Sequence, residues 1–104
     1  MKWSILDQSP VRQGHDEDVA IRDSLALARR CDRLGFHRYW LSEHHDSASL
    51  AGTAPEILAA AIAATTQHIR VGSAGVMLPH YSALKVAEQF RVLDTVIMGH
   101  ARLW

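Results

Sequence analysis

The sequence predicts an α/β fold of three consecutive strand–helix units, because short apolar segments alternate with longer amphipathic ones along the chain. Each unit takes about 35 residues, a length typical of β/α repeats. Strands joined through helices lie parallel, with right-handed crossovers. Three such units leave a sheet with two unpaired edges and one bare face, whereas parallel sheets are normally covered on both faces. The pattern therefore predicts the first part of a larger fold.

The first unit begins with a strand from Trp3 to Asp7, which the Pro- and Gly-containing segment "QSPVRQG" ends. Acidic residues 16–18 favour the positive end of a helix dipole and predict the start of a helix. Apolar side chains at helical spacing continue to Leu34, and Gly35 provides a left-handed stop.

The second unit begins with the strand "HRYWLS", residues 37–42. The sequence "TAPE" predicts the next helix start, with Thr53 as N-cap, Pro55 in the first turn and Glu56 completing a capping box. The helix itself is the alanine-rich segment 57–66, whose small side chains permit close packing on a sheet.

The third unit begins with the strand "IRVGSAGVML", residues 69–78, which ends at Pro79. The third helix is expected to start near Ser82, to carry apolar side chains at helical spacing as far as Ile97, and to stop at Gly99. No further strand follows.

Large side chains at strand positions are expected in the core, and this applies to Trp3, Trp40 and Met77. His80 and Tyr81 flank the turn after the third strand, and the simplest expectation is that both are exposed turn residues.

The overall composition excludes several classes of protein. The 104 residues suffice for one small domain, and 11 basic against 11 acidic side chains give zero formal net charge, which argues against nucleic-acid or anionic-membrane binding. The single Cys31 permits no internal disulfide and is expected to be a small buried hydrophobe. Without a signal-peptide pattern or an apolar run of the ~20 residues that span a bilayer, we expect a soluble cytoplasmic protein.

The segment "SEHHD" places four ionisable side chains at the end of the second strand, where ligands bind in parallel α/β folds. Because side chains alternate along a strand, His44 and His45 cannot both point to one side, which makes them a poor metal pair. One histidine that is positioned by a carboxylate is a better general acid or base. A solvated polar loop, in which Glu43 pairs with Arg38 or Lys85, remains the alternative.

The segment "GSAGVMLP" places small residues inside the third strand, where they weaken it. A flat ligand that lies on bare main chain at Ala74 and Gly75 explains this composition. A bulge or a tight helix–sheet contact explains it equally well. The glycines do not form a phosphate-binding fingerprint.

Taken in order, the segments "LDQSP", "RYWLSEHH", "APEILAA" and "IRVGSAGVMLPHYSALKVAEQFRVLD" resemble the bacterial luciferase-like flavin-dependent monooxygenases. The resemblance covers residues 3 to about 95, and it implies a TIM (β/α)8 barrel of which residues 1–96 form the first three βα units. It further implies that reduced FMN binds at the carboxyl ends of the strands and reacts with molecular oxygen to oxidise a small organic substrate.

The resemblance also assigns residues. His44 matches the family's active-site histidine, which in some members is an acid–base group toward the flavin–oxygen adduct, and Glu43 and His45 complete the implied catalytic group. Ala74 and Gly75 match the positions at which the family holds a non-proline cis peptide against the isoalloxazine ring. No metal is implied. A deazaflavin-dependent parent that transfers hydride shares these features, so that alternative stays open.

The end of the chain departs from the family pattern. Family members continue with a Pro-Gly-Arg turn and a glycine-rich fourth strand, whereas Met98, Gly99 and His100 stand here. Residues 97–104 are therefore an atypical tail, expected from a shifted reading frame or a truncation. A complete barrel takes about 250 residues, so we expect the chain alone to bind flavin weakly or not at all, without turnover. The alternative is a non-catalytic assembly module that completes a barrel with another chain, or self-associates, through its exposed parallel edges.

Overall fold

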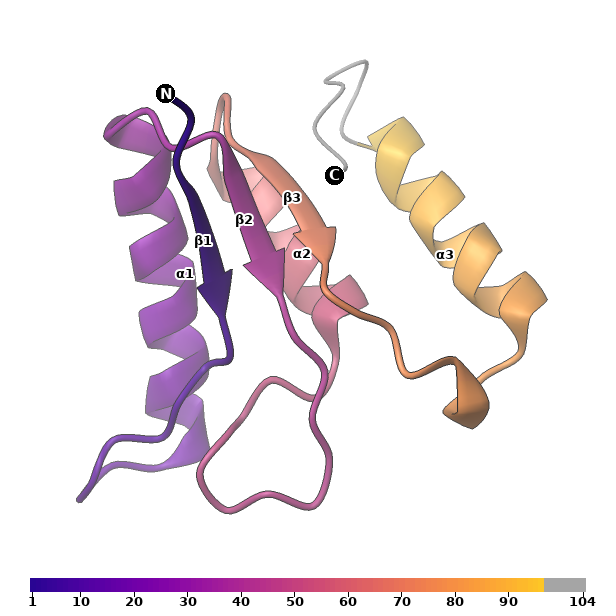
Figure 1. Cartoon of the computed structure of the whole chain (residues 1–104), viewed down its shortest axis with the longest axis horizontal. Helices are drawn as coiled ribbons and strands as arrows, with labels where there is room; N and C mark the ends of the chain where they lie inside the picture. Colours follow the sequence, from indigo (N-terminus) through magenta and orange to yellow (C-terminus); the bar gives the residue numbers. More distant parts are fainter. Residues whose placement is uncertain (97–104) are drawn as a thin grey trace.

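The computed structural model describes residues 1–96, which form a three-stranded parallel sheet with helices packed on one face (Figure 1). The elements in chain order are β1 (Ser4–Asp7), α1 (Glu17–Arg33), β2 (Arg38–Leu41), α2 (Pro55–Thr65), β3 (Arg70–Ser73), the 3-10 turn η1 (Leu78–His80) and α3 (Ala83–Val96). This arrangement confirms the predicted α/β fold of three βα units. No helix among these residues combines the length and apolar character needed to cross a membrane.

The strands lie in the order β1-β2-β3, and their register aligns Leu6 with Trp40 and Trp40 with Gly72. All three strands run in the same direction, so their carboxyl ends share one edge of the sheet. Figure 1 shows the three strand arrows pointing to that edge, from which the segments that follow them leave in different directions.

The core lies between the sheet and the helices. Tyr39 and Leu41 of β2 and Ile62 of α2 are almost fully buried there. Cys31 is buried among them at 3% exposure, which confirms the prediction of a small buried hydrophobe. Helix α3 contributes Phe90 from its inner side.

Within residues 1–96, no helix covers the opposite face of the sheet. Leu6 points to this face, since alternation along β1 and β2 sends it away from the core, and it is 58% exposed. Trp40 shares the face and is only partly buried, with the Arg38 guanidinium over its ring. The expectation that Trp3 and Met77 belong to the core is wrong, because Trp3 precedes β1 and Met77 follows β3, outside the helix-covered part of the sheet.

The ends of α1 are as predicted. Asp16 is the N-cap, and its carboxylate accepts a hydrogen bond from the Val19 backbone N–H at 3.0 Å. After the helix, Gly35 adopts a φ of 82°, the left-handed conformation that glycine takes without strain.

The predicted capping box of α2 is wrong. The N-cap position is Ala54, no side chain caps this helix, and Pro55 occupies its first turn. Thr53 lies one residue too early, because its backbone N–H donates to the Ala51 carbonyl in a turn that ends before the helix starts.

The third strand is shorter than predicted. It ends at Ser73, and the chain then turns through η1 instead of remaining extended as far as residue 78. Helix α3 begins next to Ser82, as expected, and the Ser82 hydroxyl accepts from the Lys85 backbone N–H. The predicted helix end at Gly99 and the tail 97–104 lie outside the described residues.

Asp32, near the end of α1, holds the start of β3. Its carboxylate accepts from the backbone N–H groups of Gln67, His68 and Ile69 at 2.8, 2.9 and 2.8 Å. Burial of this carboxyl raises its pKa, but the three hydrogen bonds outweigh that effect and hold the pKa below its usual value. A pKa depressed by folding means that the bonds stabilise the protein at neutral pH and lose their effect as the pH falls through the lowered pKa.

We therefore expect Asp32→Ala to reduce the free energy of unfolding by about 1–3 kcal/mol at pH 7, because three backbone donors lose their acceptor. Urea denaturation monitored by circular dichroism measures the difference. The difference should shrink steadily below about pH 4, as wild-type Asp32 becomes protonated. Asp94→Ala, which removes an exposed carboxylate from α3, is the matched control and should have little effect. An Asp32→Ala effect of the same size at pH 7 and at the lowest accessible pH would contradict this account.

Candidate active site

The site residues predicted from the sequence all lie where β2 and β3 end. Hydrogen bonding between strands continues past these ends, because Ser42 N–H donates to the Asp7 carbonyl at 3.3 Å and Ala74 N–H donates to the Leu41 carbonyl at 2.7 Å. The exits of the three strands are therefore held beside one another before their chains diverge.

His44 lies on one side of the β2 exit. Its backbone N–H donates to the Gly52 carbonyl at 2.8 Å, and its ring Nδ1 is 3.2 Å from the Ser42 hydroxyl oxygen. Gly52 permits this close packing, since a Cβ there would lie 3.2 Å from the Gln8 carbonyl oxygen and 3.3 Å from that of Ser42. The His44 Nε2 makes no hydrogen bond within residues 1–96, which leaves it available to a ligand.

Glu43 lies on the other side of the exit, and its side chain has no exposed surface. Its carboxylate accepts hydrogen bonds from the Tyr81 hydroxyl at 2.6 Å and from the Met77 backbone N–H at 3.2 Å. It also forms a hydrogen bond with His45 Nε2. We call Glu43, His45, Met77 and Tyr81 the Glu43 network. A buried carboxylate is tolerated only where donors replace its water, and this network supplies them.

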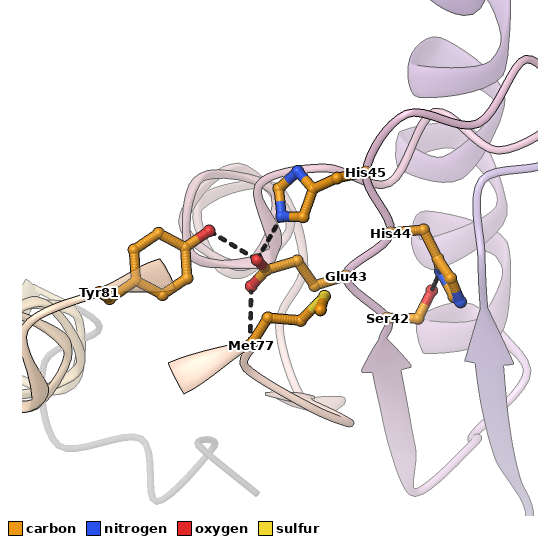
Figure 2. A network of polar contacts seen from close by, with 6 residues as sticks. All are labelled: Ser42, Glu43, His44, His45, Met77 and Tyr81. Carbon is orange, nitrogen blue, oxygen red and sulfur yellow. Dashed lines mark hydrogen bonds and ion pairs between the residues drawn. The ribbon is translucent and has the colours of Figure 1, made fainter. Parts of the chain in front are cut away.

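Figure 2 shows His44 beside Ser42 on one side of the chain and His45 beside Glu43 on the other. The two histidines therefore point apart, as the alternation of side chains predicted. Within the described residues, no three His, Cys, Asp or Glu side chains converge in the way a metal ion requires. The solvated-loop alternative does not describe Glu43. Its side chain is buried, and its carboxylate is hydrogen-bonded to the other members of the Glu43 network and not paired with Arg38 or Lys85.

The Glu43 network shifts the pKa values of Glu43 and Tyr81. Burial raises the pKa of the Glu43 carboxyl, but the hydrogen bonds from Tyr81, His45 and Met77 outweigh it and lower the pKa overall. The hydrogen bond to Glu43 is also the main reason that the pKa of Tyr81 rises to about 12. At neutral pH, Glu43 is therefore an anion and Tyr81 is a neutral donor.

The peptide bond between Ala74 and Gly75 is cis, as the family resemblance implied. Both residues are exposed, and a Cβ added to Gly75 would have no atom within 4 Å. This open space excludes a tight helix–sheet contact as the reason for the glycine. The backbone of Ala74 and Gly75, which we call the backbone shelf, is instead accessible to a ligand.

Sequence reasoning missed two parts of this edge. Tyr81 was expected to be an exposed turn residue, and although 38% of it is exposed, its hydroxyl reaches the buried Glu43 carboxylate. Asp7 was assigned only as a strand end, but its buried carboxylate accepts from the Tyr39 hydroxyl and from Ser9 N–H. A buried acid at a strand end indicates that a donor must exist, but the donor's identity depends on tertiary packing.

Comparison with known proteins gives a consistent result. Residues 1–104 match the family described as luciferase-like monooxygenase. N-acetyl-S-alkylcysteine monooxygenase of Bacillus subtilis (strain 168) is 43% identical over 103 residues, an alignment that covers 99% of this chain and 31% of the relative. The crystal structure of apo-MsnO8 has a TM-score of 0.91 and 48% identity, over 95% of this chain and 30% of that one.

A more distant structure shares the fold. The oxygenating constituent of 3,6-diketocamphane monooxygenase from Pseudomonas putida, solved in complex with FMN, has a TM-score of 0.86 and 24% identity, over 96% of this chain and 28% of that one. The chain thus spans about 30% of the length of the proteins it matches, and its three βα units correspond to part of their TIM barrel. Since the family match extends over every residue, this chain belongs to the luciferase-like monooxygenase family.

Proposed function

We propose that this chain supplies the first three βα units of a flavin-dependent monooxygenase that acts on a small organic molecule. The observation that carries the proposal is the joint presence of His44, with a free Nε2, and the open backbone shelf at one edge of the sheet. FMN is the proposed cofactor, because a monooxygenase of the same fold was solved with FMN.

The residues of this edge fit a flat ring system. The backbone shelf has no side chain beyond a methyl group, and the space around Gly75 is open. Reduced FMN, when bound, supplies the electrons that activate molecular oxygen. His44 would hold or move a proton at its Nε2, since its Nδ1 is occupied by Ser42. Glu43 and His45 complete the proposed catalytic group from the other side of the strand exit.

For the 104-residue chain alone, we expect weak or no FMN binding and no turnover. Ligand pockets bury most of a ligand's surface, whereas the backbone shelf lies at the open edge of a three-stranded sheet. Titration of the purified chain with FMN, followed by equilibrium dialysis, measures this. Tight binding of one FMN per chain would contradict the expectation.

A chimera tests the proposed activity itself. Residues 1–96 of this chain replace the matching segment of N-acetyl-S-alkylcysteine monooxygenase, and the product is assayed with reduced FMN, oxygen and an N-acetyl-S-alkylcysteine. We expect oxygenation that depends on both FMN and oxygen. The unaltered relative is the positive control, and a folded chimera that neither binds FMN nor oxygenates the substrate would contradict the proposal.

A second candidate is an assembly module without catalysis. The exposed Leu6 and the outer edges of β1 and β3, which have no strand partner within residues 1–96, favour it, because another chain can cover that face and pair with those edges. Sedimentation of the purified chain as one defined oligomer would support this function, whereas a polydisperse aggregate would argue against it.

A further inference from the structure

We propose that Tyr81 is a positioning residue of this site, whose hydroxyl acts through the buried Glu43 carboxylate to fix the backbone of residues 75–77 and the ring of His45. This inference rests on the proposed function, because the backbone that Tyr81 holds continues directly from the backbone shelf. Neither the family match nor the sequence pattern assigns a role to Tyr81.

The Glu43 carboxylate joins segments that are far apart in the sequence. Met77 lies 34 residues from Glu43 and Tyr81 lies 38 residues from it, yet both donate to the same carboxylate. His45, the third partner, comes from the β2 exit itself. Charge-assisted hydrogen bonds to a buried carboxylate are among the stronger ones in proteins, so this contact is a firm link between the two strand exits.

The segment from Gly75 to Tyr81 depends on that link. Its own backbone hydrogen bonds are local, such as Tyr81 N–H to the Leu78 carbonyl at 2.9 Å, and Ala74 provides the last bond to the sheet. Within residues 1–96, the hydrogen bonds that join this segment to the rest of the protein all end on Glu43. The polar contacts that position the chain just beyond the backbone shelf therefore come from the Glu43 network, while Val76 packs against the hydrophobic core.

Tyr81 also restricts His45. The Tyr81 hydroxyl donates to Glu43 Oε2, and His45 Nε2 forms a hydrogen bond with the same oxygen. The tyrosine hydroxyl therefore limits the positions that the His45 ring can take. The His80 ring packs edge-to-face on the His45 ring, with the two ring centroids 5.3 Å apart. His44 lies outside this arrangement (Figure 2), so the effect of Tyr81 is confined to the backbone shelf and His45.

Amide hydrogen exchange of the full 104-residue chain tests the positioning role. In Tyr81→Phe, we expect the Met77 amide to exchange about tenfold faster than in the wild type, while the Ala74 amide changes less than about twofold. Glu43→Gln should also accelerate Met77. Tyr39→Phe is the matched control, because it removes a tyrosine hydroxyl from a different carboxylate at the same edge and should leave the Met77 amide unchanged. Equal Met77 exchange in wild type and Tyr81→Phe, or equal acceleration at Ala74 and Met77, would overturn the proposal.

Tyrosine ionisation, measured while the chain remains folded, provides a second readout that is local to the Tyr81 hydroxyl. In carbon-13 NMR, wild-type Tyr81 should titrate with a pKa of about 12, whereas Glu43→Gln should lower its pKa toward the usual value of about 10. The carboxylates that face the hydroxyl are Glu43 and, less closely, Glu56, and the other ionisable neighbours are His45, His80 and Lys85. An unchanged pKa in a folded Glu43→Gln chain would contradict the link.

Neither readout requires flavin. If the exchange and ionisation results are as expected but the chimera fails to bind FMN, the proposed function is contradicted and the role of Tyr81 in holding this backbone stands.

Discussion

Replacement of His44 by alanine in the chimera is expected to lower the rate of oxygenation about 100- to 10,000-fold, the usual contribution of a positioned proton-transfer group. His44 is the histidine whose Nε2 is free on the Ser42 side of the strand exit, whereas the Nε2 of His45 is engaged by Glu43. Steady-state kinetics with a saturating supply of reduced FMN measure the loss, which should fall mainly on kcat.

Two further histidine variants make this result specific. His45→Ala should reduce the rate by about tenfold, because it disturbs the Glu43 network without removing His44, the proposed proton-transfer group. His68→Ala removes an exposed imidazole just before β3, at the opposite edge of the sheet, and should leave the rate unchanged. A loss for His44→Ala that is no larger than the loss for His45→Ala would show that the roles of the two histidines are assigned wrongly.

Ile62→Ala is expected to lower the free energy of unfolding by about 2–5 kcal/mol, the range for the loss of a large aliphatic side chain from a packed core. Ile62 is fully buried between α2 and the sheet. Small domains have only about 5–15 kcal/mol of stability in total, so this single change should leave much of the chain unfolded at 37 °C.

The same helix offers the control. Ile57→Ala is the identical substitution five positions earlier in α2, where the side chain is 67% exposed, and it should cost less than about 1 kcal/mol. Urea denaturation followed by circular dichroism compares the two variants. Similar losses for both would mean that α2 does not pack on the sheet as described.

Local signals made most of the fold predictable. Asp16 and Gly35 mark the ends of α1 through chemistry that acts within a few residues, and both predictions are confirmed. Thr53 carries the same kind of signal but is overruled by a turn of the preceding loop. Trp3 was placed in the core because of its size and neighbours, and no local pattern shows that it precedes the covered part of the sheet.

The candidate site was also predictable only where local signals determine it. Alternation along an extended chain was enough to separate His44 from His45, and this is what the structure shows. The donors to Glu43 were not predictable, since Tyr81 is 38 residues away and is brought close only when β3 pairs with β2. The family resemblance located the backbone shelf, whereas its openness to a ligand is a property of the three-dimensional structure that no local sequence pattern indicates.

The uncovered face of the sheet also determines how a cell would handle this chain. Leu6 and Trp40 present apolar surface there, between two strands whose outer edges have no partner within the described residues. Molecular chaperones and proteases recognise such surfaces, and the same surfaces promote aggregation. While that face stays uncovered, we expect the chain to be prone to aggregation and to proteolysis.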